Sequence, residues 1–485
     1  MKTLLTFILS IVAASSALAA DAKRPNIVLI LADDLGWKDV GYQGTDYYET
    51  PNIDRLSKQG MVFSAAYSPV ANCQGSRACL ISGQYTPRRM LFANGSSERG
   101  PDAEKRLVPI PTLSGLASEN VTVAEGLKAA GYATGIFGKW HLDQRRPGVA
   151  PDKQGFDTVF ESEGGGKKNE PGNPKGIYSL TKAVGEFMET NKERPFFVYL
   201  PHYAIHVGHQ SLPATMAKFK AKQRGKQHND PAYAACLADL DDGVGILMKR
   251  IADLGLADNT LVIFTSDNGG YSGSSQEPLR GNKGCYYEGG IRVPFFAIWP
   301  GKIKPGTTCD VPVNSPDLYP TFLAAASAPV PKDKVLDGES LLPLLQGEGP
   351  LKRQSIFWHF PGYLDNPATR GREIDIKAGF RSRPVSVIHK GDWKLHLYFE
   401  EWVLDGGRAK LATNHAVELY NLKDDIGERT DIANTNTAKR DELLDELLAW
   451  HRSVEAPIPT KPNPAYAPGK AATKNGKRKS KPSDE

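Results

Sequence analysis

The 485-residue sequence predicts an α/β fold in which a large mixed, mostly parallel sheet is flanked by helices. Near-continuous apolar runs, typical of strands buried on both faces of a parallel sheet, alternate with helical patterns. These runs are 26–32, 133–137, 195–200, 261–265 and 294–299. A chain of this length exceeds one ordinary core, so we expect two domains.

Two helices between these runs have clear end signals. Thr122 and Glu125 form a capping box at the start of one helix. Asp230 caps a longer helix, which keeps helical apolar spacing until Gly255 ends it. Asp241 and Asp242 lie inside this longer helix, and we interpret them as structural or solvated residues rather than metal ligands.

A smaller C-terminal α+β domain is predicted after a change in pattern near 345–350. Short apolar segments at 385–389, 393–398 and 417–420 predict an antiparallel sheet, and Gly/Asp turns separate them. One helix follows, with an apolar face made by Leu443, Leu444, Leu447, Leu448 and His451. The predicted divisions are a signal peptide at 1–19, the α/β domain at 20–346, the α+β domain at 347–460 and a disordered basic tail at 461–485.

The N-terminus predicts export. Lys2 is followed by an apolar run at 4–14 and by Ala17-Leu18-Ala19, which is the pattern of a secretory signal peptide. The run is too short to span a bilayer, so we expect a periplasmic or extracellular protein that does not span the membrane. The pattern predicts no particular oligomeric state.

The net charge of +5 has a local origin. Residues 461–485 contain seven Lys or Arg and two acidic residues, which accounts for +5 by itself. The rest of the mature chain is nearly neutral, so its charge gives no reason to expect a nucleic-acid partner.

The five cysteines show neither a disulfide framework nor a zinc pattern. An odd number leaves at least one thiol unpaired or chemically altered, and we interpret most of them as buried small apolar residues. The five are Cys73, Cys79, Cys236, Cys285 and Cys309.

Polar side chains follow two of the predicted strands. Asp33 and Asp34 end the first, and Asp267 and Asn268 end the fourth. Ligands of parallel sheets bind outside the carboxyl ends of the strands, and this all-oxygen set suits Ca²⁺ or Mg²⁺ rather than zinc. One such pair alone would fit a cap of the following turn equally well; two pairs favour a metal site.

The segment 73–83 starts at Cys73. If a helix begins there, Arg77 lies one turn further on the same face, and the helix N-terminus and the guanidinium together favour an anion beside Cys73. Both a nucleophilic thiolate and a buried inert cysteine fit this pattern.

This segment resembles the signature of the type I sulfatases, C-x-P/A-S-R followed by L-x-T/S-G, a family of the alkaline phosphatase superfamily. Further segments resemble that family in its own order and extend the resemblance over about 24–453. They are 26–36, 50–56, Gly138-Lys139-Trp140-His141, 195–200 with His206, Ser266-Asp267-Asn268-Gly269, 280–292, 389–395 and 418–422.

The resemblance implies an alkaline phosphatase-like fold and an arylsulfatase-like sulfuric ester hydrolase. It also implies that a maturation enzyme oxidises Cys73 to formylglycine, and that Ca²⁺, rather than Mg²⁺, is the bound ion. The implied metal ligands are Asp33, Asp34, Asp267, Asn268 and the oxidised Cys73. The residues implied around the sulfate and the nucleophile are Arg77, Lys139, His141, His206 and Lys283, with His206 near the leaving group and His141 near the hydroxyl that starts the elimination.

Two positions depart from the family pattern. Gly75 stands where the family has Pro or Ala, and Val207-Gly208 where many relatives have Thr-Pro. One alternative is therefore an unconverted sulfatase-like protein that binds glycans, which only Gly75 suggests. Another is a phosphodiester or phosphonate ester hydrolase of the same superfamily.

The expected substrate is a sulfated polysaccharide or oligosaccharide, with specificity set by the loops 90–111, 161–176, 209–229 and 361–381. Candidate substrate contacts in or near these loops fit an ordinary loop role equally well. They are His202, His209, Arg370 and Arg372, with Arg381 and Arg383 following.

Overall fold

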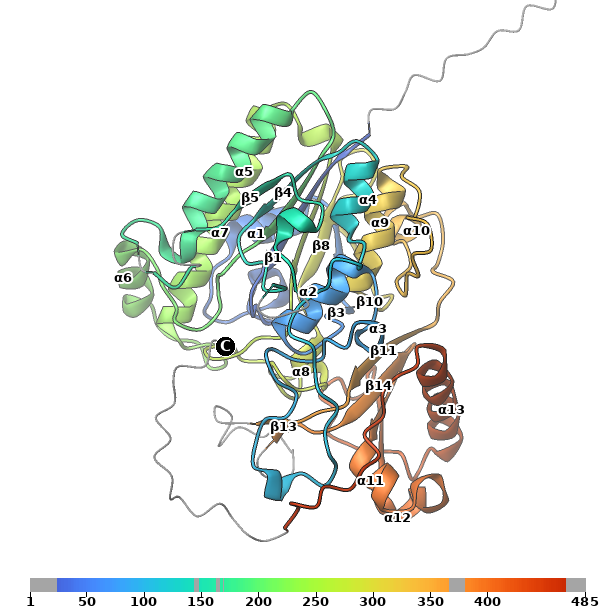
Figure 1. Ribbon diagram of the computed structural model, residues 1–485. Helices are drawn as coiled ribbons and strands as arrows, with labels where there is room; N and C mark the ends of the chain where they lie inside the picture. The colour runs from blue at the N-terminus through green and yellow to red at the C-terminus, as the bar shows by residue number, and fades with distance from the viewer. Residues whose placement is uncertain (1–23, 144–147, 163–165, 169, 366–379, 468–485) are drawn as a thin grey trace, which may run out of the picture.

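The centre of the computed structural model is an eight-stranded sheet with the order β5-β4-β6-β1-β7-β8-β2-β9 (Figure 1). Within it only β8 runs antiparallel to its neighbours, which confirms the predicted mixed, mostly parallel sheet. The strands are β1 (Asn26–Ala32), β2 (Met61–Phe63), β4 (Ala133–Phe137), β5 (Thr158–Phe160), β6 (Phe196–Pro201), β7 (Thr260–Ser266), β8 (Phe295–Ile298) and β9 (Thr307–Cys309).

The structure describes residues 24–143, 148–162, 166–168, 170–365 and 380–467. The predicted signal peptide therefore lies outside the described residues, as do Arg370 and Arg372. Among the described residues, no helix is both long enough and apolar enough to cross a membrane.

Helices cover both faces of the sheet, as predicted (Figure 1). Successive residues of β1 point to opposite faces, so Leu29 joins one core cluster and Ile30 the other. The first cluster includes α2 (Cys73–Ser82), α4 (Val123–Ala129) and α9 (Leu318–Ala325). The second includes α1 (Pro51–Ser57), α5 (Ile177–Asn191) and α7 (Pro231–Asp253).

The predicted helix ends are confirmed. Thr122 and Glu125 make both hydrogen bonds of a capping box before α4. The Asp230 carboxylate caps α7 by accepting from the Ala232 and Tyr233 amides. Asp241, inside α7, accepts from the Asn52 and Ile53 amides at the start of α1, which fits its structural interpretation.

A second, antiparallel sheet has the order β11-β14-β15-β16, and α13 (Thr437–Ser453) packs against it. Its strands are β11 (Ser355–Phe360), β14 (Val385–Lys390), β15 (Trp393–Tyr398) and β16 (Val417–Asn421). This confirms the predicted C-terminal α+β architecture. Trp358 and Val387 of this sheet share a core cluster with Ala65 and Tyr67 of the α/β part.

The remaining elements are short or connect the two sheets. They are α3 (Thr86–Arg89), α6 (Pro213–Ala221), α8 (Glu288–Ile291), α10 (Leu342–Gln346), α11 (Phe399–Leu404), α12 (Leu411–Asn414), the pair β3 (Ala66–Tyr67) and β10 (Val313–Asn314), and the pair β12 (Leu364–Asp365) and β13 (Phe380–Ser382).

The structure differs from the prediction at the tail. Residues 461–467 were expected to be disordered, but they lie along the segment 103–108. Val108 donates its amide to the Lys461 carbonyl at 2.8 Å, and Asn463 donates to the Arg106 carbonyl at 2.9 Å. Backbone pairing of this kind does not depend on the Lys- and Pro-rich composition on which the prediction rested.

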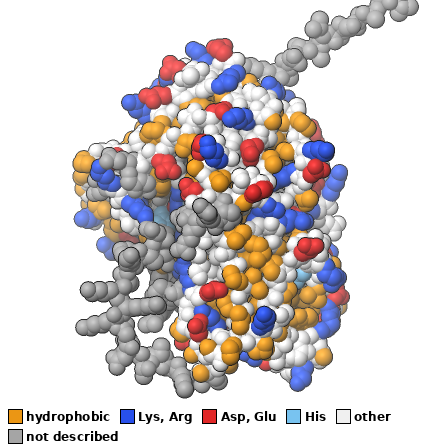
Figure 2. All heavy atoms as spheres, in the orientation of Figure 1, with side chains coloured by type: hydrophobic (Ala, Val, Ile, Leu, Met, Phe, Trp, Pro, Cys, Tyr) orange, Lys and Arg blue, Asp and Glu red, His pale blue; other side chains and the backbone are white. Residues whose placement is uncertain are grey.

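Charges of both signs are interspersed over the face shown in Figure 2.

The two parts of the chain are joined by a buried ion network. The Lys394 ammonium on β15 lies 2.9 Å from Glu288 on α8 and 3.0 Å from Glu428, and all three side chains are fully buried. Replacing one member of such a network leaves a buried charge without its partner, which is costly.

We therefore expect Lys394→Met to lower the free energy of unfolding by about 3 kcal/mol, measured as a shift of the urea midpoint. The matched control is Lys249→Met, which removes an exposed ion pair to Asp253 and should change stability by less than about 0.5 kcal/mol. Equal midpoints for the two variants would contradict a supporting role for the network.

Candidate active site

Two strand ends bring the predicted acidic residues together. β1 and β7 pair in parallel, with Ala32 opposite Ser266, so the residues that follow each strand emerge at the same edge. The Asp34 amide donates to Asp267 Oδ1 at 3.2 Å, and Asn268 Nδ2 donates to Asp34 Oδ1 at 2.8 Å. Asp34 holds this position with a left-handed backbone, φ +66°, which is strained for a non-glycine residue.

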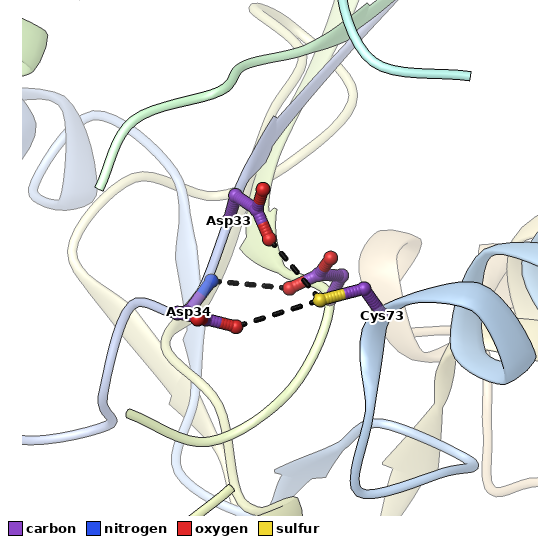
Figure 3. A group of neighbouring side chains, drawn as sticks. Asp33, Asp34 and Cys73 are labelled. Atoms are coloured by element: carbon purple, nitrogen blue, oxygen red, sulfur yellow. Dashed lines mark hydrogen bonds between the residues drawn. The ribbon is translucent and has the colours of Figure 1, made fainter. Parts of the chain in front are cut away.

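Cys73 faces these carboxylates from the first position of α2 (Figure 3). Its Sγ lies 3.3 Å from Asp33 Oδ1 and 3.6 Å from Asp34 Oδ1, and its side chain is fully buried. Burial raises the pKa of the thiol well above its ordinary value, and the carboxylates of Asp267 and Asp33 raise it further. The unmodified thiol is therefore a poor nucleophile in this setting.

The predicted metal ligands fit a hard cation. Ligand atoms of Asp33, Asp34, Asp267 and Cys73 all lie within 4.8 Å of one another. Asn268 Oδ1 is buried and has no hydrogen-bond partner among the described residues, so an oxygen is available beside the carboxylates. Three carboxylates and an amide oxygen form the type of oxygen set that Ca²⁺ or Mg²⁺ takes.

Three predicted cations offset the three carboxylates. Lys139 Nζ lies 2.7 Å from Asp33 Oδ2, and Lys283 Nζ lies 2.9 Å from Asp34 Oδ2. Arg77, fully buried on α2, donates from Nε and Nη2 to Asp267 Oδ2 at 2.9 and 2.7 Å. Its Nη2 also lies 3.6 Å from Asp33 Oδ1, the oxygen that Cys73 contacts, and its Nη1 donates to the Lys139 carbonyl at 2.7 Å.

The protonation of the carboxylates follows from these contacts. Burial by itself would raise the pKa of Asp33, but Lys139, His206 and Arg77 hold that pKa well below its usual range. Burial also opposes ionisation of Asp34, whose pKa Lys283 and His206 lower. Burial and the neighbouring Asp33 raise the pKa of Asp267 to about 6, and the paired Arg77 guanidinium favours its ionised form.

The two predicted catalytic histidines lie beside the charged groups of the cluster. His206 Nε2 lies 3.8 Å from Asp34 Oδ2, and burial lowers the pKa of His206 to about 4. Burial, with Lys139 and Arg77, lowers the pKa of His141 well below its ordinary value. His141 has a left-handed backbone, φ +65°, and Gln74 Nε2 donates to its carbonyl at 3.1 Å.

Two residues that the sequence did not reveal hold the loop that carries His206. Lys175 is buried, and its Nζ donates to the Val207 carbonyl at 3.1 Å. Gln210 accepts from the Lys175 amide at 2.9 Å and donates to the Gly166 carbonyl at 3.2 Å. No motif marks these residues, because their role depends on three loops meeting in space.

Two of the predicted substrate contacts differ from expectation. His202 is fully buried at the end of β6, and neither ring nitrogen has a hydrogen-bond partner among the described residues. Its lack of exposed surface argues against a contact with substrate, and burial lowers the pKa of His202 to about 3. His209 packs edge-on against Tyr233 of α7, which favours a loop-packing role. Arg383 forms buried ion pairs with Glu401 and Glu400.

Close packing explains why glycine stands at position 75. A Cβ atom at this position would lie 2.8 Å from the Leu91 carbonyl oxygen and 3.0 Å from Val70 Cγ1. The backbone after α3 therefore approaches α2 too closely for a larger residue.

All five cysteines, which lie within the described residues, are free thiols, and Cys79, Cys236 and Cys285 are buried as expected.

Sequence comparisons place the chain among sulfatases. A model of the family described as Sulfatase matches residues 25–328, and one described as N-sulphoglucosamine sulphohydrolase, C-terminal, matches 281–378. A sulfatase of Formosa agariphila is 32% identical over 92% of each chain. Human arylsulfatase A is 34% identical, with 90% of this chain and 89% of that protein covered.

Solved protein structures share the fold of this chain. The crystal structure of Ps i-CgsB superposes with a TM-score of 0.70 at 29% identity, and the match covers 91% of this chain and 95% of that one. The same protein has been crystallised in complex with k-i-k-neocarrahexaose. The architecture is thus alkaline phosphatase-like, as predicted.

The packing at Gly75 is testable. We expect Gly75→Ala to lower the free energy of unfolding by about 1–3 kcal/mol, because the added methyl group meets a backbone carbonyl that cannot move freely. The control is Gly185→Ala within α5, where the new Cβ meets only the flexible Arg250 side chain, at 3.3 Å. That variant should be neutral or more stable by up to about 1 kcal/mol in chemical denaturation. If Gly75→Ala does not change the free energy of unfolding, close packing does not explain why glycine stands at this position.

Proposed function

The chain belongs to the sulfatase family and is a sulfuric ester hydrolase, and from this premise we propose that it is an exported enzyme that removes sulfate from sulfated polysaccharides or oligosaccharides with a residue formed by oxidation of Cys73. The observation that carries the proposal is the position of Cys73. Its Sγ faces Asp33 and Asp34 inside a cluster that also holds two lysines.

The buried thiol argues for the oxidised form. With its pKa raised by burial and by two carboxylates, Cys73 has little thiolate character, so a sulfur nucleophile is disfavoured. An aldehyde at residue 73, once hydrated, supplies two hydroxyls on one carbon, one to accept the sulfate and one whose deprotonation expels it. The proposal therefore includes a maturation enzyme that uses a two-electron oxidant such as molecular oxygen: the Cβ–S bond breaks, the sulfur leaves as sulfide, and a carbonyl forms at Cβ.

A divalent cation, proposed to be Ca²⁺, would be held by Asp33, Asp34, Asp267 and Asn268 and would supply a Lewis acid for the sulfate oxygens and the attacking hydroxyl. Lys139 and Lys283 each contact one of these carboxylates, so they lie where they can neutralise charge on the transferring group. Arg77 keeps Asp267 and Asp33 in place and so acts as a positioning residue.

The histidines are proposed to move the protons. His206 would protonate the leaving alcohol, and His141 would accept the proton that starts release of sulfate. Burial holds both in the neutral form. An anionic substrate favours the imidazolium, so His206 would gain its proton when the sulfate ester binds.

The substrate class and the location are part of the proposal. The complex of Ps i-CgsB with k-i-k-neocarrahexaose supports a saccharide substrate for this chain as well. The N-terminal pattern of Lys2, an apolar run and Ala17-Leu18-Ala19 supports export to the periplasm or beyond.

The first test combines chemistry and activity. The protein is produced with a formylglycine-generating enzyme, and the Cys73 peptide is examined by mass spectrometry. We expect an aldehyde at residue 73 and hydrolysis of an aryl sulfate well above that of the matching aryl phosphate. A thiol at residue 73 without activity would favour a glycan-binding protein. An aldehyde with preference for the phosphate would favour the phosphoester hydrolases.

Cys73→Ser tests the need for two hydroxyls. Serine offers one hydroxyl, so it can accept sulfate but has no second hydroxyl to expel it. We expect this variant to gain the mass of one sulfate on residue 73 and then to stop. Cys79→Ser, on the same helix, is the matched control and should turn over normally. Continuous turnover by Cys73→Ser would contradict the proposed release step.

Removal of the metal ion should reduce both activity and stability. Dialysis against EGTA leaves three carboxylates without the ion, and a ligand at 100 times its Kd contributes about 2.7 kcal/mol of stability. We expect the thermal midpoint and aryl sulfatase activity to fall, and Ca²⁺ to restore both better than Mg²⁺. An Asp267→Asn variant should respond less to Ca²⁺. Full activity after chelation would contradict the metal assignment.

A further inference from the structure

A groove of about 670 Å³ lies at the opposite end of α2 from the active site. Cys73 is the first residue of α2, whereas Gln84 lies just beyond the last residue of that helix and lines the groove. At 1.5 Å per residue, the 10 residues of α2 separate the two places by about 15 Å. The groove is large enough for a small ligand, and none of the residues that line it belongs to the metal cluster.

Two basic side chains that line this groove have no acidic partner. Arg89, the last residue of α3, forms no hydrogen bond or ion pair from its side chain with any described residue, and its Nε is buried. Lys334 forms no ion pair within the described part of the chain, and its Nζ lies 5.2 Å from the centre of the Tyr319 ring. Burial and the neighbouring Arg89 lower the pKa of Lys334 to about 8. A bound anion would offset both positive charges.

The other charges near the groove are either paired or exposed. Arg88 is neutralised by Asp337, because its Nε lies 2.9 and 3.0 Å from the two carboxylate oxygens. The remaining charged residues that line the groove, one lysine and three acidic residues, are exposed: Lys332, Glu119, Asp333 and Glu455. Solvent and salt screen exposed charges, so the positive charge of Arg89 and Lys334 dominates the inner part of the groove.

Two buried amide groups leave an oxygen available in the same groove. Gln84 donates from Nε2 to the Val335 carbonyl at 2.8 Å, and Asn120 donates from Nδ2 to the Ala117 carbonyl at 3.0 Å. These bonds determine which amide atom is the oxygen. Gln84 is 5% exposed and Asn120 is 8% exposed, and neither side-chain oxygen has a hydrogen-bond partner among the described residues. Buried acceptors of this kind are normally paired, so a ligand with hydroxyl donors fits beside them.

We propose that this groove is a second binding site, which takes an anionic saccharide. Arg89 and Lys334 bind the sulfate, phosphate or carboxylate group of the sugar, and Gln84 and Asn120 accept hydrogen bonds from its hydroxyls. A sugar carries both kinds of group on one ring, whereas an inorganic sulfate ion offers no donor to the amides. The site goes beyond the proposed function and does not depend on it, because no residue of the metal cluster takes part.

Isothermal titration calorimetry of the whole chain tests the site with glucose 6-sulfate, glucose 6-phosphate, glucuronate, glucose and inorganic sulfate. Arg89→Gln and Lys334→Gln each remove one cation, and Gln84→Leu removes one amide oxygen. Lys332→Gln is the matched control, since this lysine lies on the same loop as Lys334 but is exposed. Lys283→Gln removes a lysine of the metal cluster, so it separates binding in the active site from binding in the groove.

We expect at least one of the three anionic sugars to bind more tightly than glucose and inorganic sulfate, and the best of them identifies the preferred anion. Arg89→Gln and Lys334→Gln should each raise its Kd by roughly 10- to 100-fold, as loss of a hydrogen bond to a charged group does. Gln84→Leu should raise that Kd by about 2- to 10-fold and leave the Kd of inorganic sulfate unchanged. Lys332→Gln and Lys283→Gln should preserve binding in the groove. The three groove variants should keep kcat/KM for an aryl sulfate within about threefold.

Three outcomes would overturn the site. The first is equal affinity for glucose and the anionic sugars, and the second is an affinity that neither Arg89→Gln nor Lys334→Gln changes. The third is loss of all sugar binding in Lys283→Gln, which would assign that binding to the active site. Inorganic sulfate that binds as tightly as the best sugar would overturn the saccharide as ligand. Absence of aryl sulfate hydrolysis in the parent would count against the proposed function alone, because the titration requires no turnover.

Discussion

The site depends on the burial of three carboxylates at the ends of two adjacent parallel strands. Asp33, Asp34 and Asp267 are each at most 2% exposed, and such charges are tolerated inside a protein only with partners. Arg77, Lys139 and Lys283 supply these partners from three separate segments. Removing one partner of a buried ion pair costs about 3–5 kcal/mol, so the cluster ties α2 and two loops to the strand ends.

This constraint also sets the position of Cys73. Arg77 lies one turn after Cys73 on α2, and its guanidinium is fixed by Asp267 and by the Lys139 carbonyl. The helix therefore cannot turn or slide without breaking that ion pair. The residue proposed as the nucleophile is thus located by an arginine whose guanidinium is paired with Asp267.

The sequence predicted those parts of the fold that local patterns decide. The apolar run at 26–32 and the capping box at Thr122 match the structure, and the convergence of Asp33 with Asp267 follows from parallel pairing. The run at 294–299 carries no signal for direction, so the antiparallel pairing of β8 with β7 had no basis in the pattern. β11 went unpredicted although it pairs with β14, because strand order in an antiparallel sheet is a tertiary property.

For the site residues, too, the sequence predicts what local patterns decide and not what tertiary contacts decide. Their identities follow motifs, but their contacts depend on residues far along the chain. Arg77 and Asp267 are 190 positions apart, so an inward guanidinium could not be distinguished from one facing substrate. Gly75 departs from the family pattern because Leu91, on a separate segment, approaches it. His202 follows an apolar strand directly, and only the packed structure distinguishes burial from a rim position.

Charge balance has a consequence for binding. In their ionised forms, the three carboxylates of the cluster balance the charges of Arg77, Lys139 and Lys283. A bound divalent cation would therefore give the cluster a net charge of about +2, and this charge acts strongly because the effective dielectric inside the protein is low. A sulfate ester then relieves part of that excess, which means that the cation and the anion each favour binding of the other.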